Sequence, residues 1–243
     1  MDRRKRDRQA LSGVGDSLLI NHRRGVFAIA DSPDSNPSAS RNFLYSFNRV
    51  VEDLSSRRPE FWNGCCDVDL LTKSLTYDVN RLIESVDYRS STTFSCMICL
   101  RTEDNVAAIM LHAGDTCIFK VNTIENTIEQ ISRSSINFVG KADKISQAEP
   151  VEVQHDTRFV LCSDGLQVLA RNSEGRTLQA ILLEAMRHPE VHEIPDLIMK
   201  RYVPQIELPD DLAVIVLDPH KLNRSGETIL LGGEAFNPRT PPG

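Results

Sequence analysis

The sequence predicts an α+β domain, in which helices and strands fall in separate blocks along the chain. After a short β-rich start, two long helical patterns follow one another, and from residue 91 the pattern changes to a series of β-rich runs. This order does not show the strand–helix–strand alternation that is typical of a parallel βαβ fold. The content of 40% hydrophobic and 26% charged residues is typical of a globular domain with a sizeable core.

The first elements are predicted to be two short strands, at residues 16–21 and 25–31. The second contains the continuously apolar run Val-Phe-Ala-Ile-Ala, which is typical of a strand covered on both faces. A turn-rich stretch follows it. Asn36 before Pro37 suits the cap and the first position of a helix, so a helix is expected to begin there.

Two amphipathic helices are predicted next, because apolar side chains recur at helical spacing within residues 43–54 and 71–86. Each pattern leaves one apolar stripe, so each helix is expected to lie on a sheet. The β-rich runs that follow are separated by short turns and suggest an antiparallel meander. They cover residues 92–100, 106–112, 116–121 and 127–131.

The second half of the domain is expected to begin with a small flap at residues 138–149. A buried strand is predicted at residues 158–162, which read Arg-Phe-Val-Leu-Cys. The remaining predicted elements are helices at 166–170, 178–186 and 194–202 and a last strand at 212–217.

The chain is expected to divide into a basic disordered tail (residues 1–10), one domain (residues 11–218) and a peripheral tail (residues 219–243). No apolar stretch of the kind found in secretory signals follows the basic start. No run approaches the ~18 apolar residues of a membrane-spanning helix. We therefore expect a cytoplasmic protein without membrane contact.

The formal net charge of −6 argues against a dedicated nucleic-acid surface. Six cysteines at irregular spacing do not make a disulfide framework, which indicates a reducing compartment. Cys96 and Cys99 form a C-x-x-C pair inside a predicted strand. Their side chains are expected to point to opposite faces, which argues against a zinc or redox role for this pair.

Aspartates recur where apolar strands begin or end. They are Asp16, Asp31, Asp164 and Asp210. If the sheets bring these ends together, the carboxylates repel one another unless a cation or proton compensates. Oxygen ligands suit Mg²⁺ or Mn²⁺, and two such ions ~3.5–4 Å apart would activate a water and hold a phosphoryl group. The alternative is that each aspartate only caps a helix or starts a turn.

Five short blocks resemble motifs of the metal-dependent type 2C (PPM) serine/threonine protein phosphatases, in particular their bacterial branch. The Ser-Asp-Gly after an apolar strand is the most specific of them, and the blocks occur in family order across about residues 13–218. The blocks are Gly25–Asp31, Ser91–Thr93, Ala113–Thr116, Phe159–Leu166 and Asp210–Val216.

The resemblance implies a four-layer α-β-β-α sandwich of two mainly antiparallel sheets flanked by helices, with two or three Mn²⁺ or Mg²⁺ ions between the sheets. Asp31 would bridge two ions, and Asp31 and Asp164 would be essential for catalysis. The other implied ligands are Asp16, Asp210 and the carbonyl of Ser32, with Asp115 and Asp164 at a third, looser ion. Asp211, next to Asp210, is expected to matter much less.

The sequence also departs from the family pattern. The usual Asp-Gly-x-Gly-Gly turn reads Asp31-Ser-Pro-Asp-Ser, and Leu11 stands where the family has a phosphate-binding arginine. Ala213 stands in place of the threonine of the closing strand. The candidates to replace the arginine are Arg23, Arg24 and Arg41, and those for a general acid are His22 and His112.

The function implied by the resemblance is hydrolysis of phosphoserine or phosphothreonine in a phosphorylated protein substrate by a metal-activated water, in a signalling role. Two alternatives stay open. The chain could be a catalytically weak pseudophosphatase that acts as a regulatory binding module, or a hydrolase of small phosphate esters. The sequence leaves the oligomeric state undetermined.

Overall fold

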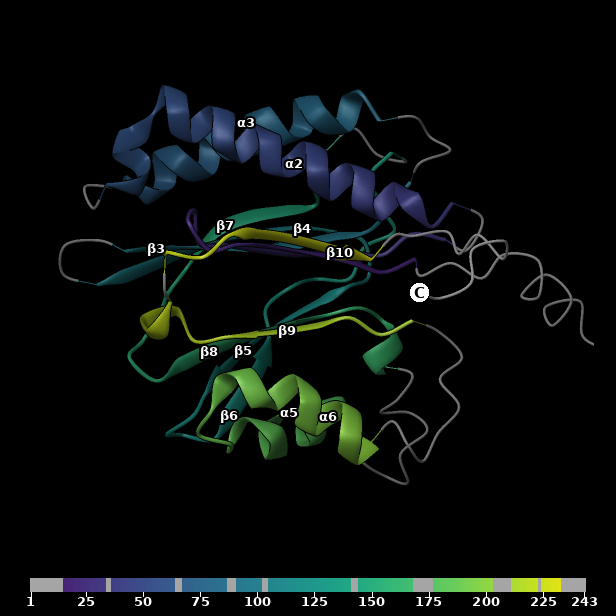
Figure 1. The fold of residues 1–243 in the computed structure, drawn as a ribbon, viewed down its shortest axis with the longest axis vertical. Coiled ribbons are helices and arrows are strands. Elements are labelled where there is room, and N and C mark those ends of the chain that lie inside the picture. Colours follow the sequence, from purple (N-terminus) through teal and green to yellow (C-terminus); the bar gives the residue numbers. More distant parts are fainter. Residues whose placement is uncertain are drawn as a thin grey trace, which may run out of the picture.

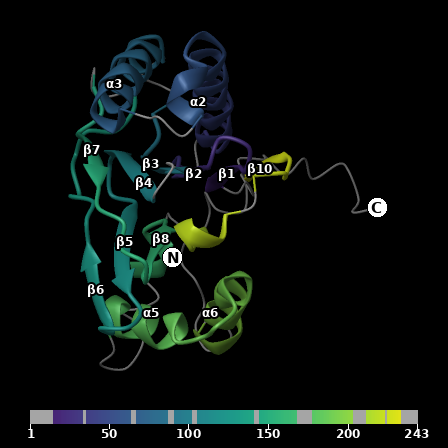
Figure 2. The ribbon, with the colours of Figure 1, turned by 90° about the vertical axis from the view of Figure 1, so that its left-hand side faces the viewer.

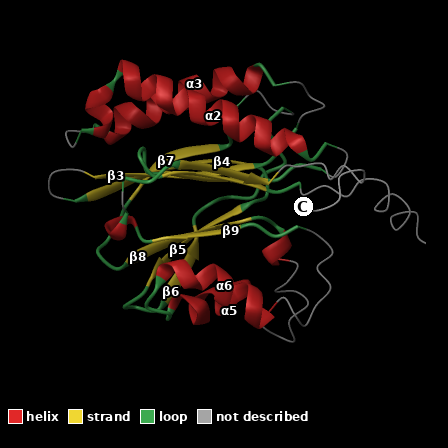
Figure 3. Ribbon diagram, viewed as in Figure 1, coloured by secondary structure: helices red, strands yellow, loops and turns green. Residues whose placement is uncertain are grey.

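The computed structural model describes residues 15–33, 36–63, 67–86, 91–101, 105–140, 144–167, 177–202, 211–222 and 224–232. In these residues two antiparallel sheets lie face to face, with helices on the outer face of each (Figure 1). Colouring by secondary structure shows the strands inside and the helices outside (Figure 3). The predicted α-β-β-α sandwich is confirmed.

All neighbouring strands are antiparallel. Among the described residues, the first sheet has six strands in the order β10-β1-β2-β3-β4-β7, and the second has four in the order β6-β5-β8-β9. The strands of the first are β1 (Ser17–Asn21), β2 (Val26–Ala30), β3 (Phe94–Arg101), β4 (Val106–Ala113), β7 (Gln147–Val151) and β10 (Thr228–Gly232). Those of the second are β5 (Cys117–Asn122), β6 (Thr127–Gln130), β8 (Thr157–Cys162) and β9 (Val214–Leu217).

Helices α2 (Ser38–Arg57) and α3 (Val68–Glu84) cover the six-stranded sheet, and α5 (Leu178–Met186) and α6 (Ile194–Tyr202) cover the other. Short 3-10 helices lie at Pro59–Trp62, Val191–Glu193 and Pro219–Lys221. The apolar stripe of α2 faces its sheet as predicted, since Phe43 and Phe47 pack edge-on against Phe94 of β3 with ring centroids 5.1 and 4.9 Å apart.

A third apolar cluster fills the space between the sheets. It includes Phe27 of β2, Met97 of β3 and Phe159 of β8. Cys99 belongs to this cluster, whereas Cys96 packs in the cluster beneath α2 and α3. The prediction that these two thiols point to opposite faces is therefore confirmed.

The start of α2 differs in detail from the predicted cap. Pro37 occupies the cap position with helical angles (φ −62°, ψ −20°) and makes no side-chain cap. Asn36 instead accepts a hydrogen bond from the hydroxyl of Ser38 at 3.2 Å. The sequence placed the cap one residue early, because Pro37 already adopts helical angles.

The predicted meander is divided between the two sheets. Strands β3 and β4 pair in the first sheet, while β5 and β6 pair in the second. The chain crosses between them at Gly114, which has a φ of +103°. A Cβ at this position would lie 2.9 Å from the Cβ of Thr93, so a glycine is needed for the crossing.

Part of the segment expected to be a peripheral tail belongs to the first sheet. Strand β10 pairs with β1 along its whole length, from Ser17 opposite Gly232 to Asn21 opposite Thr228. The basic tail predicted at residues 1–10 lies outside the described residues.

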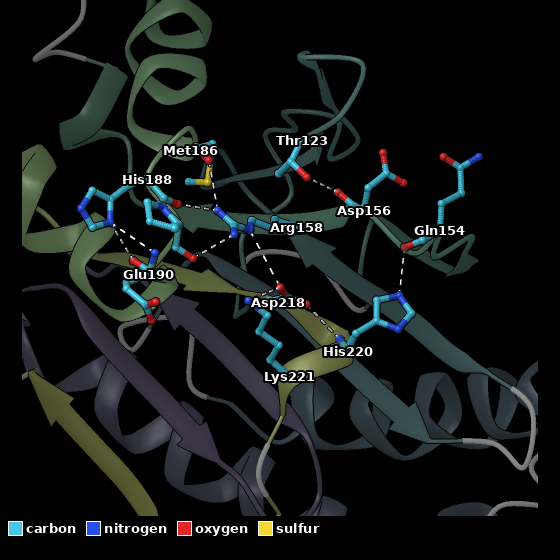
Figure 4. Close-up of polar contacts among 11 residues, drawn as sticks. Thr123, Gln154, Asp156, Arg158, Met186, His188, Glu190, Asp218, His220 and Lys221 are labelled. Atoms are coloured by element: carbon cyan, nitrogen blue, oxygen red, sulfur yellow. Dashed lines mark hydrogen bonds and ion pairs between the residues drawn. The ribbon is translucent and has the colours of Figure 1, made fainter.

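A buried arginine fixes α5 to the four-stranded sheet (Figure 4). Arg158 of β8 donates to the carbonyl oxygens of Met186 at 3.0 Å, His188 at 2.9 Å and Pro189 at 3.2 Å. Its Nε lies 3.9 Å from Oδ2 of Asp218. Carbonyl groups at the end of a helix have no partner within the helix, so Arg158 satisfies them.

Among the described residues, no helix combines the length and the apolar character that crossing a membrane requires.

Candidate metal centre

The strand register brings the predicted aspartates to one end of the sandwich. Asp16 precedes β1 and Asp31 follows β2, and these strands form an antiparallel pair in which Ser17 lies opposite Ala30. Asp164 follows β8, whose last residue, Cys162, lies opposite the first residue of β9. These ends of the two sheets meet, because the hydroxyl of Ser163 donates to Oδ2 of Asp16 at 2.6 Å.

Asp16 is the most buried of these acids, with 4% of its surface exposed. Its pKa is raised to about 7, mainly by burial and also by the negative charges of Asp211 and Asp164, while hydrogen bonds from Ser163 and with the side chain of Asp31 act in the opposite direction. Asp16, Asp31, Asp164 and Asp211 are therefore close enough to influence one another.

The backbone of Asp31 is held by the first residues of the β3 segment. Its N–H donates to Oγ1 of Thr93 at 2.8 Å, and its carbonyl accepts from the N–H of Thr93 at 2.7 Å and from Oγ1 of Thr92 at 2.6 Å. The Ser91–Thr93 block thus has a local purpose, which is to fix the position where β2 ends in an aspartate.

Ser32 lies in a network of hydroxyl groups beneath Gly15. Its hydroxyl donates to the carbonyls of Gly15 and Pro37, both at 3.0 Å, and Ser40 donates to the same Gly15 carbonyl at 2.6 Å. A Cβ on Gly15 would lie 2.3 Å from the Ser32 carbonyl oxygen. Nothing in the sequence around Gly15 indicates this close approach, which is visible only in the fold.

Ser163 and Gly165 connect Asp164 to the strand that closes the site. The hydroxyl of Ser163 accepts from the N–H of Ala213 at 3.0 Å. A Cβ on Gly165 would lie 2.0 Å from the carbonyl oxygen of Asp211. The Ser-Asp-Gly block therefore provides a hydroxyl that orients Asp16, a carboxylate, and a glycine that lets the β9 segment approach.

Asp211, which was expected to matter much less than Asp210, contacts the site directly. Its Oδ2 accepts a hydrogen bond from the N–H of Gly15 at 2.6 Å, and its charge acts on Asp16. Asp210, the predicted ligand, lies outside the described residues. The sequence shows two adjacent aspartates, Asp210 and Asp211, before the last apolar strand. Which of the two side chains faces the site depends on the local backbone.

Asp115 lies in the loop where the chain crosses between the sheets, at the same end of the sandwich. The side-chain amide of Gln167 donates to its carbonyl oxygen at 3.5 Å, and the N–H of Gln167 donates to the carbonyl of Asp164 at 2.8 Å. Gln167 therefore connects the Asp115 loop to the turn that follows Asp164.

Two of the candidate arginines and one candidate histidine lie away from this end. His22, Arg23 and Arg24 belong to the turn between β1 and β2, at the opposite end of both strands. Five residues of strand separate that turn from Asp16, which corresponds to about 16 Å. Arg24 also forms an ion pair with Glu52 at 3.0 Å, so its guanidinium has a structural role at that end.

Arg41 is the candidate arginine that lies near the acidic end. Its Nη1 donates at 3.0 Å to the carbonyl of Gly232, the residue opposite Ser17. A cavity of about 290 Å³ opens here and is lined by Asp16, Met199, Leu212, Leu231 and Gly232, among others. Arg41 is not among the described residues that line this cavity, and its contact at this end is the hydrogen bond to the Gly232 carbonyl.

His112 is a buried structural residue. Its Nε2 donates to the carbonyl of Arg133 at 3.1 Å, which leaves Nδ1 to accept from the hydroxyl of Ser95 at 2.8 Å. Burial lowers the pKa of His112, so the ring is neutral. The hydrogen bonds of His112 go to Ser95 and to the Arg133 carbonyl, so these contacts, within the described part of the chain, do not connect this candidate general acid to the aspartates.

The donor set fits a hard divalent cation. Within the described ranges, no three His, Cys, Asp or Glu side chains are already arranged to hold an ion. Asp16 and Asp211 instead hydrogen-bond to Ser163 and to the N–H of Gly15. The raised pKa of Asp16 shows, however, that neighbouring negative charges are held together in a poorly hydrated place, where a cation would relieve the repulsion.

Comparisons with known proteins agree with this picture. The family model of Stage II sporulation protein E (SpoIIE) matches residues 51–220, more than half of the chain. A search of curated proteins gave no significant match.

Many solved structures share the fold. One is PppA of Pseudomonas aeruginosa, a regulatory component of the T6SS (17% identity over 84% of this chain and 90% of that chain, TM-score 0.61). The PP2C phosphatase domain of SpoIIE from Bacillus subtilis is also similar (14% identity, 92% and 60% coverage, TM-score 0.59). So is the catalytic domain of PstP, a serine/threonine phosphatase of Mycobacterium tuberculosis, with two manganese ions (16% identity, 85% and 93% coverage, TM-score 0.56).

At these identities the solved structures establish the shared fold alone, and the family model provides the assignment. The chain belongs to the Stage II sporulation protein E (SpoIIE) family, within the bacterial branch of the type 2C (PPM) serine/threonine phosphatases.

Proposed function

We propose that this chain is a divalent-metal-dependent phosphatase that hydrolyses phosphoserine or phosphothreonine in proteins. The observation that supports it most strongly is that Asp16 shares a hydrogen bond with Asp31 while the charges of Asp164 and Asp211 act on it. These residues come from distant parts of the sequence. Concentrating acids in a buried place destabilises the metal-free fold, which is understandable if cations bind there.

Asp31 and Asp164 are proposed as the essential carboxylates, with Asp16, Asp210 and the Ser32 carbonyl as further ligands. Asp115 would serve a third, looser ion. Mn²⁺ or Mg²⁺ is the proposed cofactor, in agreement with the manganese ions of the PstP structure. When bound, the ions would supply a water of lowered pKa and neutralise phosphate charge.

The other residues of the site act on these carboxylates. Ser163 holds Oδ2 of Asp16 in one orientation, and Thr92 and Thr93 fix the backbone of Asp31. Because Asp16 has a raised pKa, a proton competes with the metal for it, and metal affinity should increase as the pH rises through about 7. Arg41, which lies nearer the acidic end than Arg23 and Arg24, is proposed to bind the substrate phosphate.

A catalytically weak pseudophosphatase is the second candidate. The hydroxyl network of Ser32 replaces the glycine turn of the family, and Leu11 replaces its phosphate-binding arginine. Both changes affect substrate binding and turnover more than they affect the carboxylates.

The test is hydrolysis of para-nitrophenyl phosphate with Mn²⁺, followed by hydrolysis of a phosphothreonine peptide. Turnover of both supports a protein phosphatase, turnover of the small ester alone supports a small-ester hydrolase, and turnover of neither supports a pseudophosphatase. Asp31→Asn and Asp164→Asn should each abolish turnover. The matched control is Asp156→Asn, near the opposite end of β8 from Asp164, which should keep wild-type turnover.

Comparing Asp210→Asn with Asp211→Asn tests the remaining ligand. Because Asp211 accepts a hydrogen bond from the N–H of Gly15 and its charge acts on Asp16, its replacement by asparagine is expected to disturb the site. Loss of metal binding in Asp210→Asn supports Asp210 as the ligand. Wild-type binding in that variant, together with loss in Asp211→Asn, would transfer the role to Asp211.

A further inference from the structure

Two buried cysteines lie directly opposite each other on neighbouring strands of the four-stranded sheet. Cys117 is the first residue of β5, and Cys162, the last residue of β8, is its partner in the antiparallel register. Figure 2 shows β5 beside β8, above α5. Both side chains belong to the cluster beneath α5 and α6, so they project from the same face of the sheet.

The spacing of this pair suits a disulfide. Directly opposed residues of antiparallel strands have Cβ atoms about 4.5–5.5 Å apart, and a disulfide needs about 3.5–4.5 Å. The two thiols already share a hydrogen bond, and both cysteines are free. A local adjustment on the order of 1 Å therefore allows a covalent bond.

The Cys117 sulfur also lies close to the Asp115 loop and to the turn that follows Asp164. The side-chain amide of Gln167 donates to this sulfur at 2.8 Å and to the carbonyl of Asp115 at 3.5 Å. The Cys117 thiol itself lies 3.6 Å from the same carbonyl, as a donor. Because Gln167 belongs to the turn that follows Asp164, the thiol helps to connect that turn to the Asp115 loop.

We propose that a peroxide converts Cys117 and Cys162 into a reversible disulfide, and that this bond weakens divalent-metal binding at the acidic end of the sandwich. In the reaction the two S–H bonds and the O–O bond of hydrogen peroxide break, one S–S bond forms, and two waters leave. The thiols are oxidised by two electrons and the peroxide is reduced. A thiol reductant reverses the change by exchange.

The effect on metal binding follows from the contacts that are lost. A disulfide has no S–H group, so the Asp115 carbonyl loses the Cys117 donor. The sulfur also moves toward Cys162, which alters the 2.8 Å contact with Gln167. The Asp115 loop and the Asp164 turn are then held together less firmly. This second part of the inference rests on the proposed function.

Cys96 and Cys99 supply a matched control. They are equally buried, but they pack in different clusters on opposite faces of β3. Two residues on opposite faces of one strand cannot form a disulfide without rebuilding the strand. A double Cys96→Ala, Cys99→Ala variant should therefore behave like the wild type.

The first experiment treats the reduced full-length chain with hydrogen peroxide in metal-free buffer and maps disulfides by mass spectrometry. We expect an intact-mass loss of about 2 Da, a linked peptide pair containing Cys117 and Cys162, and reversal by dithiothreitol. Cys162→Ala should remove the linked pair. Absence of the link in folded wild-type protein, or a link through Cys65 or Cys66 in its place, would overturn the assignment.

The second experiment measures Mn²⁺ binding by calorimetry before and after oxidation. We expect a roughly tenfold weaker affinity in the oxidised wild type, recovery with dithiothreitol, and no change in peroxide-treated Cys162→Ala. An unchanged affinity in protein with the mapped disulfide would refute the coupling. If reduced protein binds no Mn²⁺, the proposed function fails, while the mapping still decides whether the disulfide forms.

Discussion

In metal-free protein, replacing Asp16 with asparagine should stabilise the fold at neutral and alkaline pH. Asp16 is 4% exposed and has a pKa of about 7 because of burial and the charges of Asp211 and Asp164. Between its unfolded value of 3.8 and about 7, the folded chain keeps a proton that the unfolded chain has released. The free energy of unfolding therefore falls as the pH rises through this window, and it stays lower above it.

The size of the effect follows from the shift. A rise of about three pH units, at about 1.4 kcal/mol per unit, corresponds to a destabilisation of about 4 kcal/mol above pH 7. The asparagine variant avoids this cost but weakens the hydrogen bond from Ser163, which is worth about 1 kcal/mol. We expect a net gain of about 2–3 kcal/mol at pH 8 and none at pH 4.

The assay is urea unfolding of wild type and Asp16→Asn in EDTA at pH 4 and pH 8, with Asp156→Asn as the control. Adding Mn²⁺ at pH 8 to about a thousand times Kd should reverse the order, because binding at that concentration stabilises the wild type by about 4.1 kcal/mol. Two results would refute the raised pKa of Asp16 in the folded chain. One is an Asp16→Asn variant that is no more stable than the wild type at pH 8 in EDTA, and the other is an equal gain in stability at both pH values.

Three further outcomes can be measured. Gly165→Ala should lower the melting temperature and cost more than about 2 kcal/mol, because its Cβ would lie 2.0 Å from the Asp211 carbonyl oxygen; an unchanged melting temperature would contradict this close approach. Arg41→Ala should raise the KM for a phosphopeptide about tenfold with little change in kcat, and an unaltered KM would exclude it from phosphate binding. Arg158→Met should reduce the free energy of unfolding by about 2–4 kcal/mol, because three carbonyl groups lose their donor; Mn²⁺ affinity should not change, since Arg158 lies at the far end of β8 from Asp164. Equal urea midpoints for Arg158→Met and wild type would be evidence against that anchoring role.

The local elements were largely predictable, because their signals lie in short stretches of sequence. The β2 strand is predictable from its continuous apolar run, and α2 and α3 are predictable from the helical spacing of their apolar residues. The same kind of signal could not assign strands to sheets, since β4 and β5 are both largely apolar although they belong to different sheets. Strand β10 was missed for a related reason, as its partner β1 is more than 200 residues away.

The residue types of the site could also be read from the chain, because aspartates next to apolar strands remain visible without a fold. Which of them meet is a question of side-chain direction and of distance across the sandwich. Adjacent residues of an extended segment face opposite ways. The resemblance favours Asp210, and the structure shows Asp211 in contact with Gly15. Likewise, the choice among Arg23, Arg24 and Arg41 depends on which end of the strands each one occupies, and that is fixed only when the sheets and helices pack.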